Sequence, residues 1–158
     1  MRTAIILGLV IAAFSGLFTG GRAADAPQGY ASLDADEVNM RTGPGLRYPV
    51  QWVYRQSGWP VEIVSEFGYW RKVRDIDGTT GWIHQNLLSG RRRVIVTGDM
   101  APARESADPA ARVVMRLEEG VVADLGECRP DWCWIAVAGR EGWVERGVLW
   151  GVDAPARP

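Results

Sequence analysis

The feature that most constrains the fold is a short motif, Gly-Trp followed by a β-branched residue, that occurs twice, at 81–83 and at 142–144. Each copy follows a glycine-bearing turn and precedes a short polar turn and an apolar pair, as expected where a strand ends and the chain turns back onto a core. The copies lie 61 residues apart (142 − 81), so the sequence predicts two homologous modules, at 33–90 and 94–151.

Other positions repeat at nearly the same spacing. Trp70 lies opposite Trp132 at an offset of 62, and Arg41 lies opposite Arg104 at an offset of 63. Offsets that change by single residues are expected of two copies that differ only in their turns. Modules of about sixty residues are near the lower size at which a hydrophobic core supports folding alone, so we expect the two modules to support each other.

Both modules are predicted to be all-β. Apolar residues alternate along short segments bounded by Gly, Pro and Asp, and no segment makes a convincing helix. Strands are expected in the first module at 36–41, 50–55, 61–66, 69–74 and 81–84, and in the second at 112–117, 121–126, 133–137 and 142–145. Short strands joined by tight turns favour two tandem small barrels.

The N-terminal segment is typical of a secretory signal peptide. A basic start precedes an apolar run, and small residues occupy the cleavage-recognition positions up to Ala23, so we expect a periplasmic or secreted protein. The alternative is an uncleaved membrane anchor, for which the apolar run is short. We expect a cleaved signal peptide at 1–23, a linker at 24–32, a tail at 152–158, and no membrane span in the mature chain.

Charge and residue inventory argue against several functions. The formal net charge of −1 at pH 7 gives no indication of a nucleic-acid partner. The one histidine, His84, follows the Gly-Trp motif directly and is expected to be an exposed residue at a strand end. One histidine does not complete a zinc site, and no serine stands in a nucleophile motif. We therefore expect no catalysis, no metal and no cofactor.

The two cysteines, Cys128 and Cys133, lie on either side of a predicted hairpin turn. In the alignment of the two modules they occupy the positions of Glu66 and Arg71. These two positions hold opposite charges in one copy and two cysteines in the other. Both combinations are expected where two residues lie directly opposite each other on neighbouring strands. The sequence therefore predicts a Cys128–Cys133 disulfide, the usual state of such a pair in an exported protein, and an ion pair at the equivalent positions.

The aromatic residues form two groups. Four tryptophans recur in register and are expected to pack in the cores: Trp70, Trp82, Trp132 and Trp143. Four rings that do not recur are predicted to form a groove beside the loop at 42–49: Tyr48, Trp52, Tyr54 and Trp59. Such a groove could stack on sugar rings or hold an extended peptide. The alternative is that these rings form the contact between the modules. The arginines at 91–93 are expected to keep the junction solvated.

The first module contains Val38-Asn39-Met40-Arg41-Thr42-Gly43-Pro44-Gly45, followed about forty residues later by Gly81-Trp82-Ile83-His84. This pattern resembles bacterial SH3-like (SH3b) domains, in which an Asn-x-Arg strand leads into a Gly-Pro-Gly loop and the module closes with Gly-Trp-Val. The resemblance covers both modules, although the second lacks Gly-Pro-Gly. It implies a small β-barrel, an exported location and a binding role, most often towards peptidoglycan or other envelope components.

These observations lead to one hypothesis and one alternative. The hypothesis is a non-catalytic exported protein whose first module binds peptidoglycan or its stem peptides. The alternative is a periplasmic adaptor that binds an extended segment of an envelope protein. The predicted ligand-binding residues are Asn39, Arg41, Gly43, Pro44, Gly45, Tyr48, Trp52, Tyr54 and Trp59.

Overall fold

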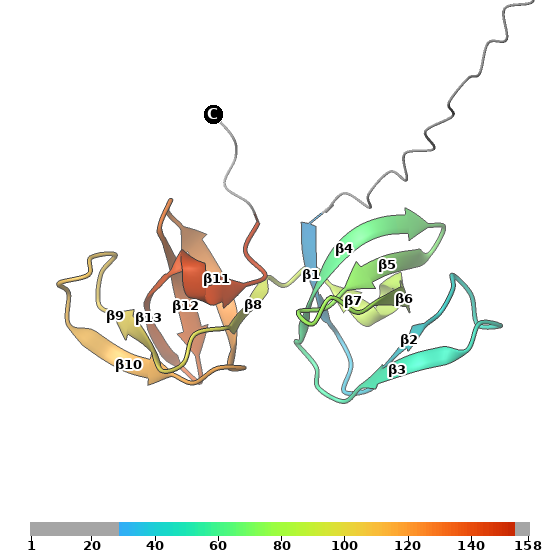
Figure 1. Cartoon of the computed structure of the whole chain (residues 1–158), viewed down its shortest axis with the longest axis horizontal. Coiled ribbons are helices and arrows are strands. Elements are labelled where there is room, and N and C mark those ends of the chain that lie inside the picture. The colour runs from blue at the N-terminus through green and yellow to red at the C-terminus, as the bar shows by residue number, and fades with distance from the viewer. Residues whose placement is uncertain (1–28, 154–158) are drawn as a thin grey trace, which may run out of the picture.

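The structure is a computed structural model that describes residues 29–153. The predicted signal peptide lies outside the described residues, as do residues 154–158 of the predicted tail. Figure 1 shows two small β modules side by side, joined by the segment between β7 (Leu88–Ser89) and β8 (Arg93–Val96). Among the described residues, no helix has the length and apolar character needed to cross a membrane.

The first module is a curved antiparallel sheet with the strand order β3-β2-β6-β5-β4-β1-β7. A short 3-10 turn, η1, precedes its last strand. The elements are β1 (Gly29–Leu33), β2 (Val38–Arg41), β3 (Val50–Tyr54), β4 (Pro60–Phe67), β5 (Trp70–Arg74), β6 (Thr80–His84), η1 (Gln85–Leu87) and β7 (Leu88–Ser89).

The second module repeats this topology with the strand order β10-β9-β13-β12-β11-β8-β14. Its elements are β8 (Arg93–Val96), β9 (Ala101–Arg104), β10 (Val113–Leu117), β11 (Val122–Cys128), β12 (Trp132–Val137), β13 (Arg140–Glu145), η2 (Arg146–Val148) and β14 (Leu149–Trp150). Each strand takes the place of its counterpart seven positions earlier. The predicted all-β fold and the predicted duplication are both confirmed.

The structure corrects the predicted linker at 24–32, because Gly29–Leu33 forms β1. This strand pairs with β4, where Ala31 lies opposite Val61, and with β7, where Leu33 lies opposite Leu88. Ala31 and Leu33 are buried. The residues before Leu33 have the composition of a linker, but Ser32 is also buried and its hydroxyl has a hydrogen-bond partner in the carbonyl of Arg91.

Each module has its own hydrophobic core. In the first, the completely buried side chains are Val38, Met40, Val61, Val73 and Ile83. In the second, they are Val94, Val96, Ala103, Cys133, Ile135 and Val144. Full burial of a Val, Ile or Met side chain stabilises a fold by about 1.5–3 kcal/mol, so each module has several strongly stabilising side chains in a core of its own.

The four recurring tryptophans do not pack in these cores, and this prediction is wrong. All four are half-buried, and strand alternation explains why. Gly81 and Ile83 of β6 point inward, so Trp82 between them points to the outer face. Trp82 and Trp143 each lie opposite a recurring arginine, Arg41 in β2 and Arg104 in β9.

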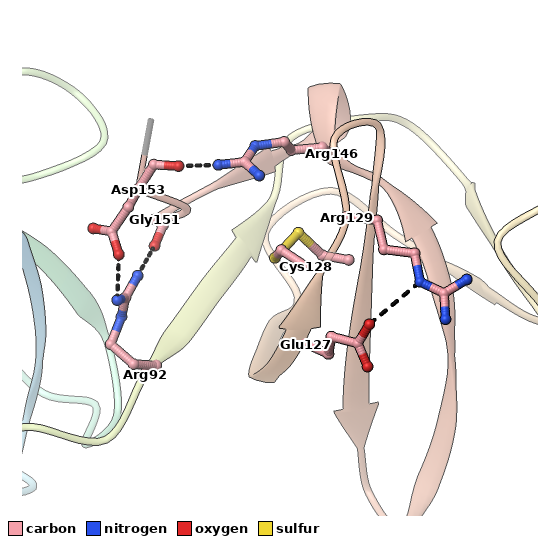
Figure 2. The surroundings of a disulfide bond; sticks show 8 residues. Arg92, Glu127, Cys128, Arg129, Arg146, Gly151 and Asp153 are labelled. Carbon is pink, nitrogen blue, oxygen red and sulfur yellow. Dashed lines mark hydrogen bonds and ion pairs between the residues drawn. A yellow bond between two sulfur atoms is a disulfide. The ribbon is translucent and has the colours of Figure 1, made fainter. Parts of the chain in front are cut away.

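The disulfide prediction is confirmed. Cys128 and Cys133 lie opposite each other in β11 and β12 and are joined by a disulfide (Figure 2). At the equivalent positions of the first module, Glu66 and Arg71 face each other in β4 and β5, with Nε of Arg71 3.4 Å from Oε2 of Glu66. One register position therefore holds a covalent link in one module and an ion pair in the other.

The modules meet along a contact that we call the seam. The rings of Tyr30 in β1 and Trp150 in β14 meet edge to face, with centroids 5.3 Å apart. Cζ of Arg92 lies 5.9 Å from the Tyr30 ring centroid, and its guanidinium donates to Asp153 and to the carbonyl of Gly151 (Figure 2). The seam therefore includes an aromatic pair and a cation over one of its rings.

The other arginines of the junction also make specific contacts. Arg93 forms an ion pair with Asp124, with Nε and Oδ1 3.0 Å apart. Its guanidinium lies against Gly58 of the first module, where a Cβ would fall 1.4 Å from Nη1 of Arg93. The carbonyl of Arg91 accepts a hydrogen bond from the Ser32 hydroxyl. The expectation that the run at 91–93 only keeps the junction solvated is therefore wrong.

Candidate functional site

Arg41 holds the loop between β2 and β3 in place. Its Nη1 donates to the carbonyl of Tyr48 at 2.8 Å and to that of Leu46 at 3.3 Å. The base of the loop is closed by a backbone bond from Thr42 N–H to the carbonyl of Pro49. Since the guanidinium is engaged inside the loop, Arg41 shapes the loop and offers little to a ligand.

The second module builds the same loop without Gly-Pro-Gly. Nη1 of Arg104 donates to the carbonyl of Ala111 at 2.7 Å, the counterpart of the Arg41 contact. The Asp108 carboxylate accepts a bond from the backbone N–H of Ala110 at 2.8 Å. An aspartate that bonds to the backbone two residues on favours a tight turn, so a side chain takes the place of the glycines.

The glycines of the first loop serve the packing of Tyr48. A Cβ at Gly43 would lie 2.5 Å from Cδ1 of Tyr48, so the ring rests directly on the Gly43 backbone. The ring is half-buried, Cζ of Arg47 lies 5.0 Å from its centroid, and Leu46 at the loop tip is 79% exposed. The loop therefore presents Leu46 and Arg47 to solvent, while Gly43 lies underneath.

Three of the four predicted rings line a single pocket of about 240 Å³, which we call the Trp52 pocket. Trp52 is 55% exposed, and its ring meets that of Tyr54 at a centroid distance of 6.4 Å. Trp59 is half-buried beside them. The lining consists of residues 52–56, Trp59, Asp75 and Asp77. An exposed tryptophan face beside carboxylates can hold a ligand that has an apolar body and a polar or cationic group.

Tyr54 and Asp75 form the buried polar part of this pocket. The Tyr54 hydroxyl donates to Oδ2 of Asp75 at 3.0 Å, and Oδ1 of Asp75 accepts from the backbone N–H of Thr79 at 2.8 Å. Burial, helped by the negative charge of Asp75, raises the pKa of Tyr54 well above its usual value. Tyr54 is 8% exposed, so it supports the pocket while Trp52 and Trp59 carry the accessible aromatic surface.

The pocket belongs to the first module because the two copies differ in one turn. Arg74 pairs with Thr80, which leaves five residues, 75–79, between β5 and β6. In the second module Val137 pairs with Arg140, which leaves only Ala138 and Gly139. The longer turn supplies the carboxylates of the pocket, and the shorter one has no residues to do so.

A second pocket, the seam pocket, lies between the modules and has a volume of about 220 Å³. It is lined by Trp59, Ile76 and Asp77 of the first module and by Ile95, Val96, Thr97, Glu119 and Gly120 of the second. Ile95 is 1% exposed although it belongs to neither core. The seam pocket therefore contains both apolar and acidic side chains.

The second module has a wider depression of about 780 Å³. Its lining residues are Pro109, Pro130, Asp131, Trp132, Glu145, Arg146 and Gly147. Among the described residues of the lining, Trp132 is the one aromatic side chain, and the charged groups have both signs. Because Arg146 also donates to the backbone carbonyl of Asp153, the arginine is partly engaged within the protein (Figure 2). The depression therefore offers less aromatic surface than the Trp52 pocket.

The predicted site residues thus separate into two groups. Trp52, Tyr54 and Trp59 come together, whereas Tyr48 lies with the loop. Tyr48 is not among the residues that line the pocket, and Trp52, four positions further on, lies about 13 Å away along an extended chain. Asn39 is half-buried on the outer face of β2, opposite Val53 in β3, and Pro44 and Gly45 stay on the loop.

Sequence reasoning missed Asp75 and Asp77. The difference in turn length between the two copies could have revealed them. An insertion in a single repeat commonly lies in a loop on the binding face. Within residues 29–153, no group of three His, Cys, Asp or Glu side chains is arranged to hold a metal ion.

The duplicated topology, the arginine-held loop and the 3-10 turn before the last strand define a tandem pair of SH3-like β modules. The family described as "Bacterial SH3 domain" matches the chain twice, at residues 34–90 and 97–151. The chain belongs to this family, which confirms the resemblance noted in the sequence.

One curated relative is YrvJ of Bacillus subtilis strain 168, whose name is "Putative N-acetylmuramoyl-L-alanine amidase YrvJ". The two sequences are 26% identical over 141 residues, which cover 82% of this chain and 27% of YrvJ. The chain thus spans about a quarter of the length of that relative.

Two solved structures are also similar. NlpC1 of Trichomonas vaginalis has a TM-score of 0.36 and 14% identity, over 78% of this chain and 46% of that one. An NlpC/P60 family protein of Bacillus cereus ATCC 10987 has a TM-score of 0.35 and 13% identity, over 77% of this chain and 56% of that one.

Proposed function

We propose that this protein is a non-catalytic, exported binding module that attaches to peptidoglycan through its first module. The observation that carries the proposal is the Trp52 pocket, in which an exposed tryptophan, a half-buried tryptophan and carboxylates converge. In this proposal Trp52 and Trp59 contact the ligand, and Tyr54 and Asp75 hold the pocket in shape.

The chemistry of the pocket supports a cell-wall ligand. Peptidoglycan combines sugar rings with short peptides, and both present apolar faces next to polar groups. A tryptophan face can stack on a sugar ring or on the apolar part of a peptide, while Asp77 can accept hydrogen bonds from amides, hydroxyls or amines. The pocket is small, so it would hold one or two ligand residues.

Family membership supports the same function. The relative YrvJ bears the name "Putative N-acetylmuramoyl-L-alanine amidase", and this chain matches about a quarter of its length. A binding module would be consistent with such a partial match. The disulfide favours an oxidising compartment outside the cytoplasm, in agreement with the leader expected from the sequence.

The proposal is tested by co-sedimentation of the purified protein with peptidoglycan sacculi, wild type beside Trp52→Ala. Because Trp52 is exposed, its replacement should leave the fold intact, as circular dichroism can verify. We expect saturable binding by the wild type and a loss of affinity of about tenfold or more in the variant, as is typical when a tryptophan at the centre of a contact is removed.

A matched control is Trp132→Ala, which makes the same substitution in the wider depression of the second module. It is expected to bind sacculi as the wild type does. Absence of binding by the folded wild type would refute the proposal and favour an envelope protein as the partner. A loss of binding in Trp132→Ala but not in Trp52→Ala would move the site to the second module.

A further inference from the structure

The Trp52 pocket and the seam pocket are neighbours. Trp59 and Asp77 line both of them, so the two hollows adjoin at these two side chains. Each hollow alone is smaller than a typical ligand site, whereas the two together reach the usual range of about 300–1,000 Å³. They form a path from Trp52 on the first module to Glu119 on the second.

The charges along this path are mostly negative. Asp77 and Glu119 have no ion-pair or hydrogen-bond partner for their carboxylates within residues 29–153. The one basic side chain in the lining, Arg55, forms an ion pair with Glu37, with Nη1 and Oε2 3.4 Å apart. Asp75 already accepts bonds from Tyr54 and Thr79. Two carboxylates therefore remain to meet a positive charge.

The walls of the path come from both modules, and the seam holds them together. Arg93 of β8 lies against Gly58, directly before Trp59. On β1, the Tyr30 ring packs against Trp150 and under Arg92. These contacts hold β8 against the first module, and the backbone N–H of Gly120 donates to the carbonyl of Val96 in β8. Together they place Glu119 at the seam without help from a ligand, so the acidic end of the path exists before binding.

We infer that the two pockets form one groove across the seam that binds an extended peptide bearing a primary ammonium group. The apolar part of the peptide lies on Trp52 and Trp59, and the ammonium group lies between Asp77 and Glu119. This inference rests on the proposed function and deepens it, since it assigns the contact to the amine-bearing stem peptides of peptidoglycan instead of its glycan strands.

The experiment compares the affinity of the full chain for three probes. These are native sacculi, sacculi whose free amines have been N-acetylated, and glycan strands stripped of their peptides. We expect acetylation to weaken binding several-fold and peptide removal to abolish it. Asp77→Asn and Glu119→Gln should each weaken binding to native sacculi about two- to fivefold, as expected for partly exposed ion pairs. On acetylated sacculi each variant should bind as the wild type does, because the amine that the carboxylates contact is already blocked.

Glu118→Gln is the matched control, because it removes the same charge from the neighbouring exposed residue, which lines neither pocket. It should bind as the wild type does. Equal affinity of the wild type for native and acetylated sacculi, or no effect of Glu119→Gln, would overturn the inference. In either case a loss of binding in Trp52→Ala would still support the proposed function. Binding to stripped strands would assign the contact to glycan, and no binding of the wild type to any probe would overturn both.

Discussion

At the scale of single residues, Tyr54 and Asp75 connect the core of the first module to its ligand-facing surface. Tyr54 ends β3 with its ring in the core and its hydroxyl on Asp75, which begins the turn between β5 and β6. Both residues are less than a tenth exposed. A buried polar group that loses its partner keeps the full cost of leaving water, so this pair should contribute measurably to stability.

We predict that Tyr54→Phe lowers the free energy of unfolding by about 1–2 kcal/mol, because Oδ2 of Asp75 would lose its donor while the ring volume stays the same. Urea denaturation followed by circular dichroism measures this. Tyr48→Phe is the control, since the Tyr48 hydroxyl accepts an exposed hydrogen bond from Nη2 of Arg47, and its effect should stay below about 0.5 kcal/mol. Equal effects of both substitutions would contradict this role of Asp75.

The same pair predicts a pH dependence with a definite sign. The folded protein raises the pKa of Tyr54, whereas an unfolded tyrosine ionises near pH 10. The stabilisation is therefore complete below about pH 10 and is lost as pH rises further, because the unfolded state then releases a proton that the folded state retains. The stability difference between wild type and Tyr54→Phe should narrow above pH 10, and a difference that widens would contradict the assignment.

At the scale of elements, the two β-hairpins that close the modules differ most in their turns. The turn between β12 and β13 contains only Ala138 and Gly139, both with positive φ, at 49° and 76°. Two-residue hairpin turns of this kind favour Asn-Gly, because asparagine tolerates the left-handed conformation better than alanine does. Ala138 is therefore a strained position.

We predict that Ala138→Asn raises the free energy of unfolding by about 0.5–1 kcal/mol, because it relieves this strain without touching the core. Thermal unfolding followed by tryptophan fluorescence measures the change. Ala138→Val is the opposite control, since a β-branched residue fits positive φ poorly, and it should destabilise the module. Stabilisation by valine and not by asparagine would contradict the assigned turn.

Elements whose residues occupy equivalent positions in the two aligned copies could be predicted from the sequence. The cross-strand position shared by Glu66–Arg71 and Cys128–Cys133 is one example, because aligned copies place equivalent residues at equivalent registers. Strand β1 could not be predicted from its own composition, since small residues occur both in linkers and in strands, and only its counterpart β8 has an apolar run typical of a strand. The inner and outer faces of β6 were also ambiguous, because Trp82 and Ile83 are both apolar.

At the scale of the whole molecule, the seam makes one unit of two modules. Each module has a separate core, yet Tyr30, Trp150 and two arginines of the junction connect them. Aromatic pairs of this kind contribute about 0.5–1.5 kcal/mol beyond their buried area. From the sequence, the non-recurring rings were expected to form either a groove or an inter-module contact. Trp59 does both, because it lines the Trp52 pocket and the seam pocket.

The candidate site was only partly predictable, because the pattern along one strand does not show which other segments cover it. Period-two alternation correctly places Trp52 and Tyr54 on one face of β3, but it does not tell how far that face is covered. Tyr54 is covered by the turn at 75–79 and Trp52 is not. The contribution of Glu119 depends on how the second module sits against the first, which no local pattern in the sequence encodes.

The claim that Trp52 and Trp59 line the ligand-binding groove is tested most directly by an NMR titration of the full chain. The titrant is soluble muropeptides released from peptidoglycan, and the tryptophan indole N–H signals are observed. Single Trp→Phe variants assign the signals. We expect saturable shifts of the Trp52 and Trp59 signals at similar muropeptide concentrations, while the Trp132 and Trp143 signals stay unchanged. Shifts confined to Trp132 and Trp143, or no shifts at saturating muropeptide, would contradict the claim.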